Sequence, residues 1–260
     1  MSNEFSGTGT PLTQAAIDNA VQRLSADLPS VWSLLAVETR GFGFLADRRP
    51  KILFERHIFH GRTDGRFGTS HPDISAPSAG GYGTGAAEYQ RLARAMQLDR
   101  SAALASASWG LGQVMGFNAV ELGYADVNDM VASFVRSEDL QLDGCVRFIE
   151  RKADLKRAFD ARKWATVAFF YNGKDYARNQ YDTKLADHYA LYAAGHCPEI
   201  ALRTAQACLV YLGLDPNGVD GLLGPGTRRA LLRFQQANGL PATGDLDTVT
   251  ERALWAAAFP

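Results

Sequence analysis

The chain has 260 residues, which suits one medium-sized domain and one small domain, each with its own hydrophobic core. Its formal net charge of −1 provides no global basic field to attract nucleic acid or an anionic membrane surface. No apolar stretch approaches the about 18 residues of a membrane-spanning helix, and the N-terminus lacks the basic and apolar segments of an export signal. We therefore expect no membrane insertion, no nucleic-acid partner and synthesis in the cytoplasm without a signal peptide.

Cysteine and histidine spacing favours neither a disulfide framework nor a metal site. Cys145, Cys197 and Cys208 are an odd number without metal-knuckle spacing, so we expect buried thiols made in a reducing compartment. His57 and His60 have no third ligand at zinc spacing. We expect no metal, no organic cofactor and a monomeric chain.

Two helices are predicted near the N-terminus. The first covers residues 11–28, with Thr10 as its N-cap, and the second lies between Ser30 as its N-cap and a terminating Gly41. The apolar periodicity of the second helix is i, i+3, i+4 and i+7, and a carboxylate takes the last of these positions. The positions are Val31, Leu34, Leu35 and Glu38.

Glu38 is the first candidate for chemistry. Its apolar helix face and the negative end of the helix dipole would both raise its pKa. A carboxylic acid that stays protonated near neutral pH is what general-acid cleavage of a glycosidic bond requires. The alternative is that Glu38 simply ends the apolar stripe and points into solvent.

Residues 49–118 are predicted to contain a short strand, a long loop and an amide-containing turn. Residues 49–57 predict a strand, and the glycine- and proline-rich residues 61–85 predict an irregular loop that can line a cleft. In residues 107–118, glycines surround two amides, Gln113 and Asn118, which suits hydrogen bonding to sugars. A tightly packed helix–turn junction explains this last pattern equally well.

The sequence pattern also predicts helices over much of residues 85–194. Tyr171 and Asn172 precede Gly173 at the end of one of them, where such side chains can face a cleft. The predicted ranges are 85–96, 101–109, 127–136, 138–160, 163–171 and 179–194.

Beyond a short linker at residues 195–199, the composition changes to that of a small three-helix module. A helix at 199–212 precedes an imperfect repeat, in which residues 220–231 are echoed by residues 243–254. Each copy is a turn followed by a helix, and together they offer little room for a catalytic cleft. We expect domains at residues 1–194 and 200–260, the second of which binds rather than cuts.

The repeat resembles the type 1 peptidoglycan-binding domain over nearly the whole module. The resemblance implies that these motif residues belong to a wall-binding module. Its matching positions include Asp220, Thr227, Phe234, Gln235 and Asp247.

The first domain resembles the N-acetylmuramidase family of phage endolysins and related wall hydrolases over about residues 10–193. The matching blocks are Val37-Glu38, residues 54–57, His71-Pro72-Asp73-Ile74, residues 108–118 and Tyr171-Asn172-Gly173. Two of these blocks are also similar to blocks of lytic transglycosylases. The resemblance implies a mainly α chain with a lysozyme-like α+β catalytic domain, and it implies that Glu38 is the catalytic acid.

A two-carboxylate mechanism needs a second acid, about 5–5.5 Å away for retention or about 6.5–9.5 Å away for inversion. Glu55 is the candidate because it follows an apolar strand, although a structural pair with Arg56 or another arginine is an alternative. Asp64 and Asp73, on the glycine-rich loop, are the next candidates.

These observations predict a lysozyme-type endolysin that cleaves the β-1,4 bond between N-acetylmuramic acid and N-acetylglucosamine and so lyses bacteria. Gln113, Asn118, Tyr171 and Asn172 are expected to position the sugar. Without a signal peptide, such an enzyme would accumulate in the host cytoplasm and reach the wall after another protein permeabilises the membrane. The alternatives are a lytic transglycosylase that forms 1,6-anhydro ends and a non-catalytic wall-binding protein.

Overall fold

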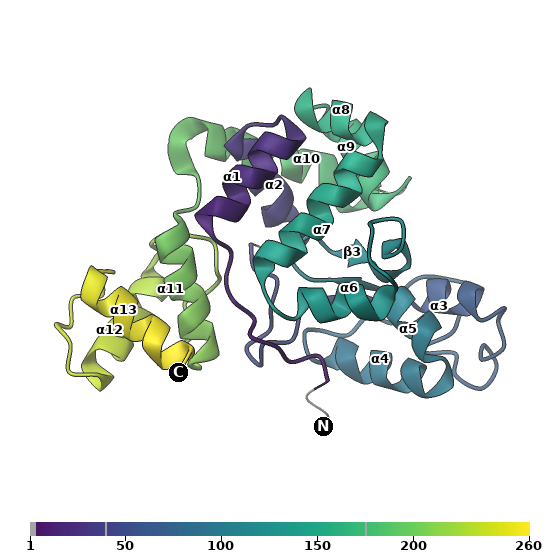
Figure 1. Ribbon diagram of the computed structural model, residues 1–260, viewed down its shortest axis with the longest axis horizontal. Coiled ribbons are helices and arrows are strands. Elements are labelled where there is room, and N and C mark those ends of the chain that lie inside the picture. Colours follow the sequence, from purple (N-terminus) through teal and green to yellow (C-terminus); the bar gives the residue numbers. More distant parts are fainter. Residues whose placement is uncertain (1–3, 40, 175) are drawn as a thin grey trace. The chain divides into compact units, whose positions relative to one another are not determined.

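The computed structural model describes residues 4–39, 41–174 and 176–260 and is mainly helical. Its elements form two compact units, each built from two separate stretches of the chain. The first unit comprises Met1–Thr10 and Gly43–Arg151, and the second comprises Pro11–Phe42 and Lys152–Pro260. The first two helices therefore belong to the same unit as the C-terminal part of the chain, and the second of them packs against α10 (Tyr181–Leu191) (Figure 1).

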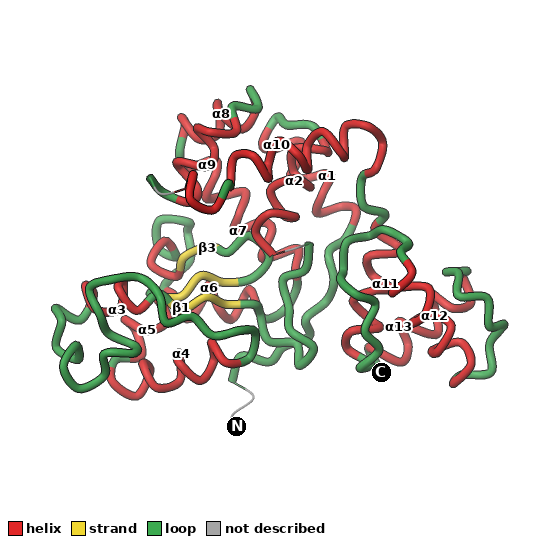
Figure 2. The backbone as a smooth tube through the Cα atoms, turned by 180° about the vertical axis from the view of Figure 1, so that it is seen from behind, coloured by secondary structure: helices red, strands yellow, loops and turns green. Residues whose placement is uncertain are grey.

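The first unit holds a small sheet among helices (Figure 2). Its strands pair antiparallel in the order β1-β2-β3, and Ile52 is opposite Trp109 in the register of the first pair. The strands are β1 (Ile52–Phe54), β2 (Ala107–Trp109) and β3 (Val114–Met115). The helices are α3 (Arg56–Arg62), α4 (Ala87–Leu98), α5 (Arg100–Ala105), η1 (Gly116–Asn118), α6 (Val127–Phe134) and α7 (Glu138–Arg151).

The helix predicted at residues 101–109 is wrong in its second half. The helix ends at Ala105, and the next residues form the fully buried strand β2, whose Trp109 is 0% exposed. Gly110 follows with a φ of +68°, a conformation that glycine adopts without strain. Pairing with β1 has therefore outweighed the helical pattern of the local sequence.

A buried ion pair fixes the edge of the sheet and the end of the long loop. The loop prediction is confirmed, because no helix or strand of the described chain lies between Arg62 and Ala87. Glu88 is 1% exposed, pairs with Arg91 at 2.9 Å and accepts the backbone N–H of Phe54 at 2.8 Å. Its other oxygen accepts the N–H of Gly83. One carboxylate thus ties β1 to the last residues of the loop.

The second unit contains the remaining helices, and α10 packs against both α2 and α9. Before the C-terminal module these are α1 (Gln14–Leu24), α2 (Leu28–Thr39), α8 (Ala153–Asp160), α9 (Trp164–Asn172), η2 (Tyr176–Asn179), α10 (Tyr181–Leu191) and η3 (Tyr192–His196). The module has α11 (Ile200–Tyr211), α12 (Pro225–Ala237) and α13 (Thr248–Ala258).

The N-caps predicted for the first two helices are wrong. Thr13, not Thr10, caps α1 by accepting the N–H of Ala16 at 3.2 Å. Helix α2 begins at Leu28, and the carboxylate of Asp27 accepts the N–H of Ser30 at 3.0 Å. Each cap residue lies three residues before the backbone N–H that it accepts, and this N–H has no partner within the helix. Several nearby hydroxyl and carboxylate side chains could serve as the acceptor, so the sequence did not single out the correct one.

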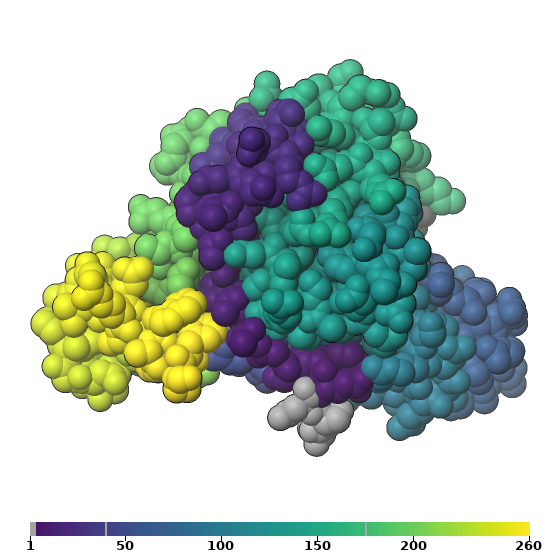
Figure 3. Space-filling view, in the orientation of Figure 1, coloured from purple at the N-terminus to yellow at the C-terminus, as the bar shows by residue number. Residues whose placement is uncertain are grey.

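The three helices of the module enclose their own core. Its buried members come from all three helices, and the module's outer surface is drawn in green to yellow in Figure 3. They are Ala205, Cys208, Leu209, Ala230, Leu231, Phe234, Leu254 and Ala258.

Two buried glutamines close the two repeat loops in the same way. Gln206 accepts the N–H groups of Asp220 and Gly221 at 2.9 and 2.7 Å, and its amide donates to Thr227 at 3.0 Å. Gln235 accepts the N–H of Gly244 at 2.8 Å, and its amide donates to the Asp245 carbonyl at 2.8 Å and to Thr250 at 3.2 Å. The sequence repeat is therefore also a repeat of hydrogen bonding.

Cys145 and Cys208 are buried, as predicted, whereas Cys197 is only half-buried, and none of the three forms a disulfide. Across residues 4–39, 41–174 and 176–260, no helix combines the length and apolar character needed to cross a bilayer.

Candidate active site

Glu38 lies in the last turn of α2, on the face that the sequence predicts to be apolar. The three apolar side chains of that face, Val31, Leu34 and Leu35, are 2% exposed or less. Glu38 itself is half-buried. After the helix, Gly41 has a φ of +81° and its N–H donates to the carbonyl of Leu35 at 3.3 Å, which agrees with its predicted role at the helix end.

Desolvation raises the pKa of Glu38 to about 8, although part of its side chain reaches solvent. The hydroxyl of Tyr181, the first residue of α10, donates a hydrogen bond to the Glu38 carboxyl. Such a bond favours the ionised form, so it opposes the effect of burial without reversing it. The carboxyl is therefore oriented by one donor and remains protonated at neutral pH.

Tyr171 joins the same group of side chains. Its ring stacks on that of Tyr181, with centroids 6.3 Å apart and planes 21° apart. Asn172 is exposed as the last residue of α9, and Gly173 follows with a φ of +80°. The structure thus brings Glu38 and Tyr171 together through Tyr181, which is 143 residues from Glu38 in sequence.

Tyr181 is a site residue that the sequence pattern did not identify. It lies at the start of a predicted helix whose charges suggest an ordinary solvated face, and nothing in its spacing connects it with Glu38. Only the packing of α10 against α2 and α9 reveals it.

Glu55, the candidate second carboxylate, lies in the first unit as the residue before α3. Its oxygens accept from the Tyr82 hydroxyl at 3.0 and 3.2 Å, and one lies 3.2 Å from Nδ1 of His57. Arg56, the partner considered from sequence, instead donates to the Ser78 carbonyl at 2.9 Å. The Tyr82 hydroxyl thus holds the carboxylate, His57 lies beside it, and the Glu55 side chain is 16% exposed.

The other acidic candidates lie on the surface of the first unit. Asp73 pairs with Arg94 at 2.5 Å, and both side chains are about half exposed. Asp64 is exposed in a turn, with a φ of +51°.

Gln113 and Asn118 occupy the hairpin and the short helix that follows it. The Gln113 amide donates to the Gly110 carbonyl at 2.8 Å, and its oxygen accepts from the Ser108 hydroxyl at 2.7 Å. Gln113 has a φ of +47°, so it also forms the turn between β2 and β3. Asn118 is 8% exposed at the end of η1. Both amides therefore lie at the packed turn that was the alternative interpretation of this motif.

Several of the module's motif residues support its fold. Thr227, Phe234 and Gln235 are 3% exposed or less. Asp220 accepts from the Gln206 amide at 2.9 Å, and Asp247 caps α13 by accepting the N–H of Thr250 at 2.7 Å. Gln206 completes the first loop in the same way as Gln235 completes the second, but it lies 29 residues before Gln235 whereas the repeats are 23 residues apart, so their offset could not have identified it.

Within the described parts of the chain, no three histidine, cysteine, aspartate or glutamate side chains lie close enough together to hold a metal ion.

Comparisons with known proteins match two parts of the chain to different families. Residues 27–193 match the N-acetylmuramidase family, and residues 200–254 match a family described as a putative peptidoglycan-binding domain. No curated protein matches the chain.

One similar solved structure is the crystal structure of the Burkholderia AP3 phage endolysin. It is 41% identical, with a TM-score of 0.65, and the match covers 70% of this chain and 71% of the endolysin chain.

Proposed function

This chain belongs to the N-acetylmuramidase family and is a peptidoglycan hydrolase, and we propose that it cleaves the β-1,4 bond between N-acetylmuramic acid and N-acetylglucosamine with Glu38 as general acid. The supporting observation is a carboxyl on a buried helix face whose pKa lies at about 8. At neutral pH it carries the proton that the leaving glycosidic oxygen needs. Tyr181 keeps that carboxyl in one orientation.

The second carboxylate in this proposal is Glu55. The Tyr82 hydroxyl holds it in place, and its partial exposure leaves it accessible to substrate or water. Its proposed role is to stabilise the oxocarbenium-like charge or to activate the attacking water. Tyr171 and Asn172, with Gln113 and Asn118, are proposed to position the sugar rings.

The C-terminal module is proposed to hold the enzyme on the wall. A groove of about 450 Å³ lies on its surface, lined by residues of α11 and α13. Trp255 lines this groove and is 44% exposed, and an exposed tryptophan is a common anchor in recognition surfaces. We propose that the enzyme acts as a monomer and reaches the wall from the host cytoplasm after the membrane has been permeabilised.

The decisive test of the acid is Glu38→Gln compared with Glu121→Gln, a matched change at an exposed glutamate. An amide cannot donate as a carboxylic acid does, so Glu38→Gln should lose about 10²–10⁴-fold in lysis of purified sacculi. It should still sediment with sacculi and keep its helical circular dichroism spectrum. Near wild-type lysis by the folded Glu38→Gln protein would disprove this role.

Mass spectrometry of the digested sacculi tests the reaction itself. Hydrolysis leaves reducing N-acetylmuramic acid ends, whereas attack by the sugar's own hydroxyl leaves 1,6-anhydro ends that are lighter by one water. Reducing N-acetylmuramic acid ends are expected. Mainly anhydro products would replace the proposal with a lytic transglycosylase, and reducing N-acetylglucosamine ends would replace it with a glucosaminidase.

A further inference from the structure

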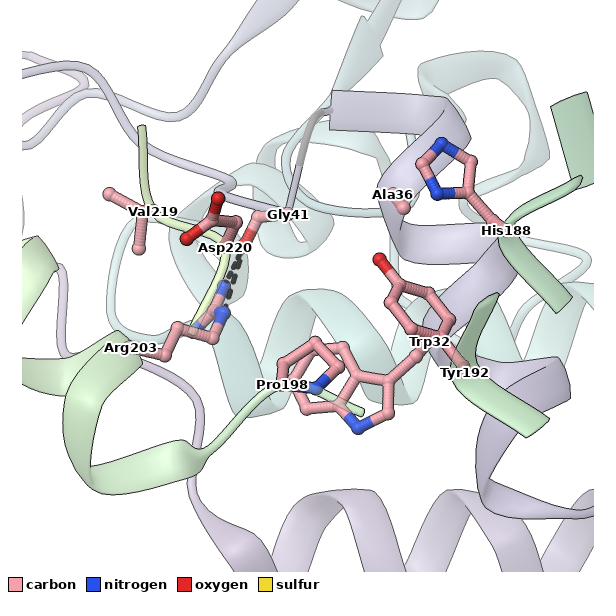
Figure 4. Close-up of a pocket in the computed structure, with 9 residues that line it drawn as sticks. All are labelled: Trp32, Ala36, Gly41, His188, Tyr192, Pro198, Arg203, Val219 and Asp220. Atoms are coloured by element: carbon pink, nitrogen blue, oxygen red, sulfur yellow. Dashed lines mark hydrogen bonds between the residues drawn. The ribbon is translucent and has the colours of Figure 1, made fainter. Parts of the chain in front are cut away.

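A buried arginine joins the C-terminal module to the end of α2. Arg203, on α11, is 0% exposed, and its Nε donates to the carbonyl oxygen of Gly41 at 2.9 Å, with a second bond from Nη2 to the same oxygen. Figure 4 shows the side chain extending from α11 to this carbonyl. Gly41 is three residues beyond Glu38, so the bonds fix the segment that ends the catalytic helix.

Aromatic rings enclose the same guanidinium. Its central carbon lies 5.9 Å from the ring of Trp32 and 5.9 Å from the ring of Phe42. Phe42 in turn contacts Tyr211 of α11, with ring centroids 5.9 Å apart. A guanidinium near aromatic faces, away from water, forms a stronger contact than an exposed one.

The backbone of Gly41 also approaches the module too closely for a side chain. A Cβ at this position would lie 2.7 Å from the carbonyl oxygen of Val219, the residue directly before the first repeat. Val219 is 3% exposed. The end of α2 is therefore held from two sides, by a helix and by a loop of the same module.

A cavity of about 170 Å³ lies beside this contact, bordered by Trp32, Tyr192, Pro198 and Arg203 (Figure 4). Gly41 also borders this cavity, so loss of the arginine bonds would leave unfilled space beside that residue.

We infer that Arg203 is a positioning residue for Glu38, so that the module is part of the catalytic framework as well as a wall anchor. This inference rests on the proposed function of Glu38. It goes beyond the expectation that the second domain binds rather than cuts, because a chain without that domain would lack Arg203, Tyr211 and Val219. Small displacements of a reacting group by a distant change can cost about 10²-fold in rate.

The test is Arg203→Met in the full chain, compared with Arg228→Met. Arg228 lies on α12, is about half exposed and pairs with Asp245 on the surface of the module. On soluble peptidoglycan fragments too short to reach a second binding site, Arg203→Met should lower kcat by about 10- to 100-fold with KM within about twofold of wild type. Arg228→Met should match wild type.

A measurement independent of activity accompanies the kinetics. Amide hydrogen exchange in the peptide that contains Gly41 and Phe42 should speed up in Arg203→Met and stay unchanged in Arg228→Met, because the carbonyl clamp limits local opening. Wild-type kcat on soluble fragments together with unchanged exchange would overturn the inference and leave the module as an anchor alone.

If Arg203→Met does not fold, the same kinetics are measured on Arg203→Lys and Tyr211→Leu. Lysine can donate to the Gly41 carbonyl from one point, and leucine removes only the ring contact with Phe42, so each should show a smaller loss of kcat. Normal kcat in both folded variants would also overturn the inference. The proposed function fails separately, because it fails only if the wild-type chain releases no muramic acid ends or Glu38→Gln stays active.

Discussion

Two glutamates, Glu88 and Glu38, allow a comparison between a carboxylate that supports the structure and one that we propose to serve chemistry. Glu88 is 1% exposed and is surrounded by donors, with an arginine at 2.9 Å and backbone N–H groups from β1 and the loop. Glu38 lies on an apolar face and receives a tyrosine hydroxyl. Glu88 is the more deeply buried of the two and has charged and backbone donors, whereas desolvation raises the pKa of Glu38, and this difference supports Glu38 as the proposed acid.

The largest expected effect comes from removing the structural carboxylate. Glu88→Ala leaves Arg91 buried beside Phe54 without its partner and frees two backbone N–H groups. Breaking a buried pair in this way costs about 3–5 kcal/mol. Urea denaturation should show this loss, whereas Glu38→Gln at pH 7 should not. If Glu88→Ala unfolded at the same urea concentration as wild type, Glu88 could not be contrasted with Glu38 as a structural carboxylate.

The second prediction concerns stability at alkaline pH. The pKa of Glu38 is about 8 in the folded chain against an ordinary 4.5, so the folded state holds this proton more tightly. The contribution of this bound proton to the free energy of unfolding is fully present below about pH 4.5 and is lost as pH rises through about 8. Each unit of that difference is worth about 1.4 kcal/mol.

Glu38→Gln cannot titrate, so above pH 8 its free energy of unfolding should exceed that of wild type. Chemical denaturation at pH 5 and pH 9 measures the difference, with Glu121→Gln as control. A wild-type protein that gains stability relative to Glu38→Gln on going to pH 9 would contradict the assignment.

A smaller effect is expected from Tyr181→Phe. The change keeps the ring that stacks on Tyr171 but removes the hydroxyl that favours ionised Glu38, so the pKa of Glu38 should rise further. The alkaline limb of kcat should move up by about one pH unit, which corresponds to one hydrogen bond to a charged group. A shift to lower pH would mean that the hydroxyl stabilises the protonated form instead.

The smallest effect is expected at the exposed pair between Asp73 and Arg94. Both side chains are about half exposed, so Asp73→Asn should change the free energy of unfolding by less than about 1 kcal/mol. Lysis should also be unchanged, since the proposed mechanism does not use this carboxylate. Loss of lysis in a stable Asp73→Asn protein would make Asp73, rather than Glu55, the candidate second carboxylate.

The sequence predicted the elements whose pattern is local. Periodicity placed Glu38 on an apolar helix face, the glycines defined the long loop, and the spaced repeat defined the C-terminal module; the mainly helical, lysozyme-like class is confirmed. The sequence could not predict features that depend on contacts between residues far apart in the chain. Residues 107–109 were predicted as the end of a helix, because the local sequence does not show that β2 pairs with β1.

The same limit applies to the site. Tyr181 contacts Glu38 from 143 residues away in the sequence, and Arg203 contacts Gly41 from 162 residues away. No spacing rule connects either pair. The roles assigned to Glu55, Gln113, Asn118, Tyr171 and Asn172, and the boundaries at residues 194 and 200, stay predictions.

The close approach of Gly41 to Val219 has a consequence for protein engineering. Exchanging wall-binding modules among lytic enzymes assumes that a module can be cut at its linker and replaced. In this chain a cut at residues 195–199 would remove the loop that rests on Gly41 and the arginine that holds its carbonyl. A chimera should therefore retain α11 and the loop to residue 221, or graft their contact residues onto the incoming module, so that the surface at the end of α2 remains covered.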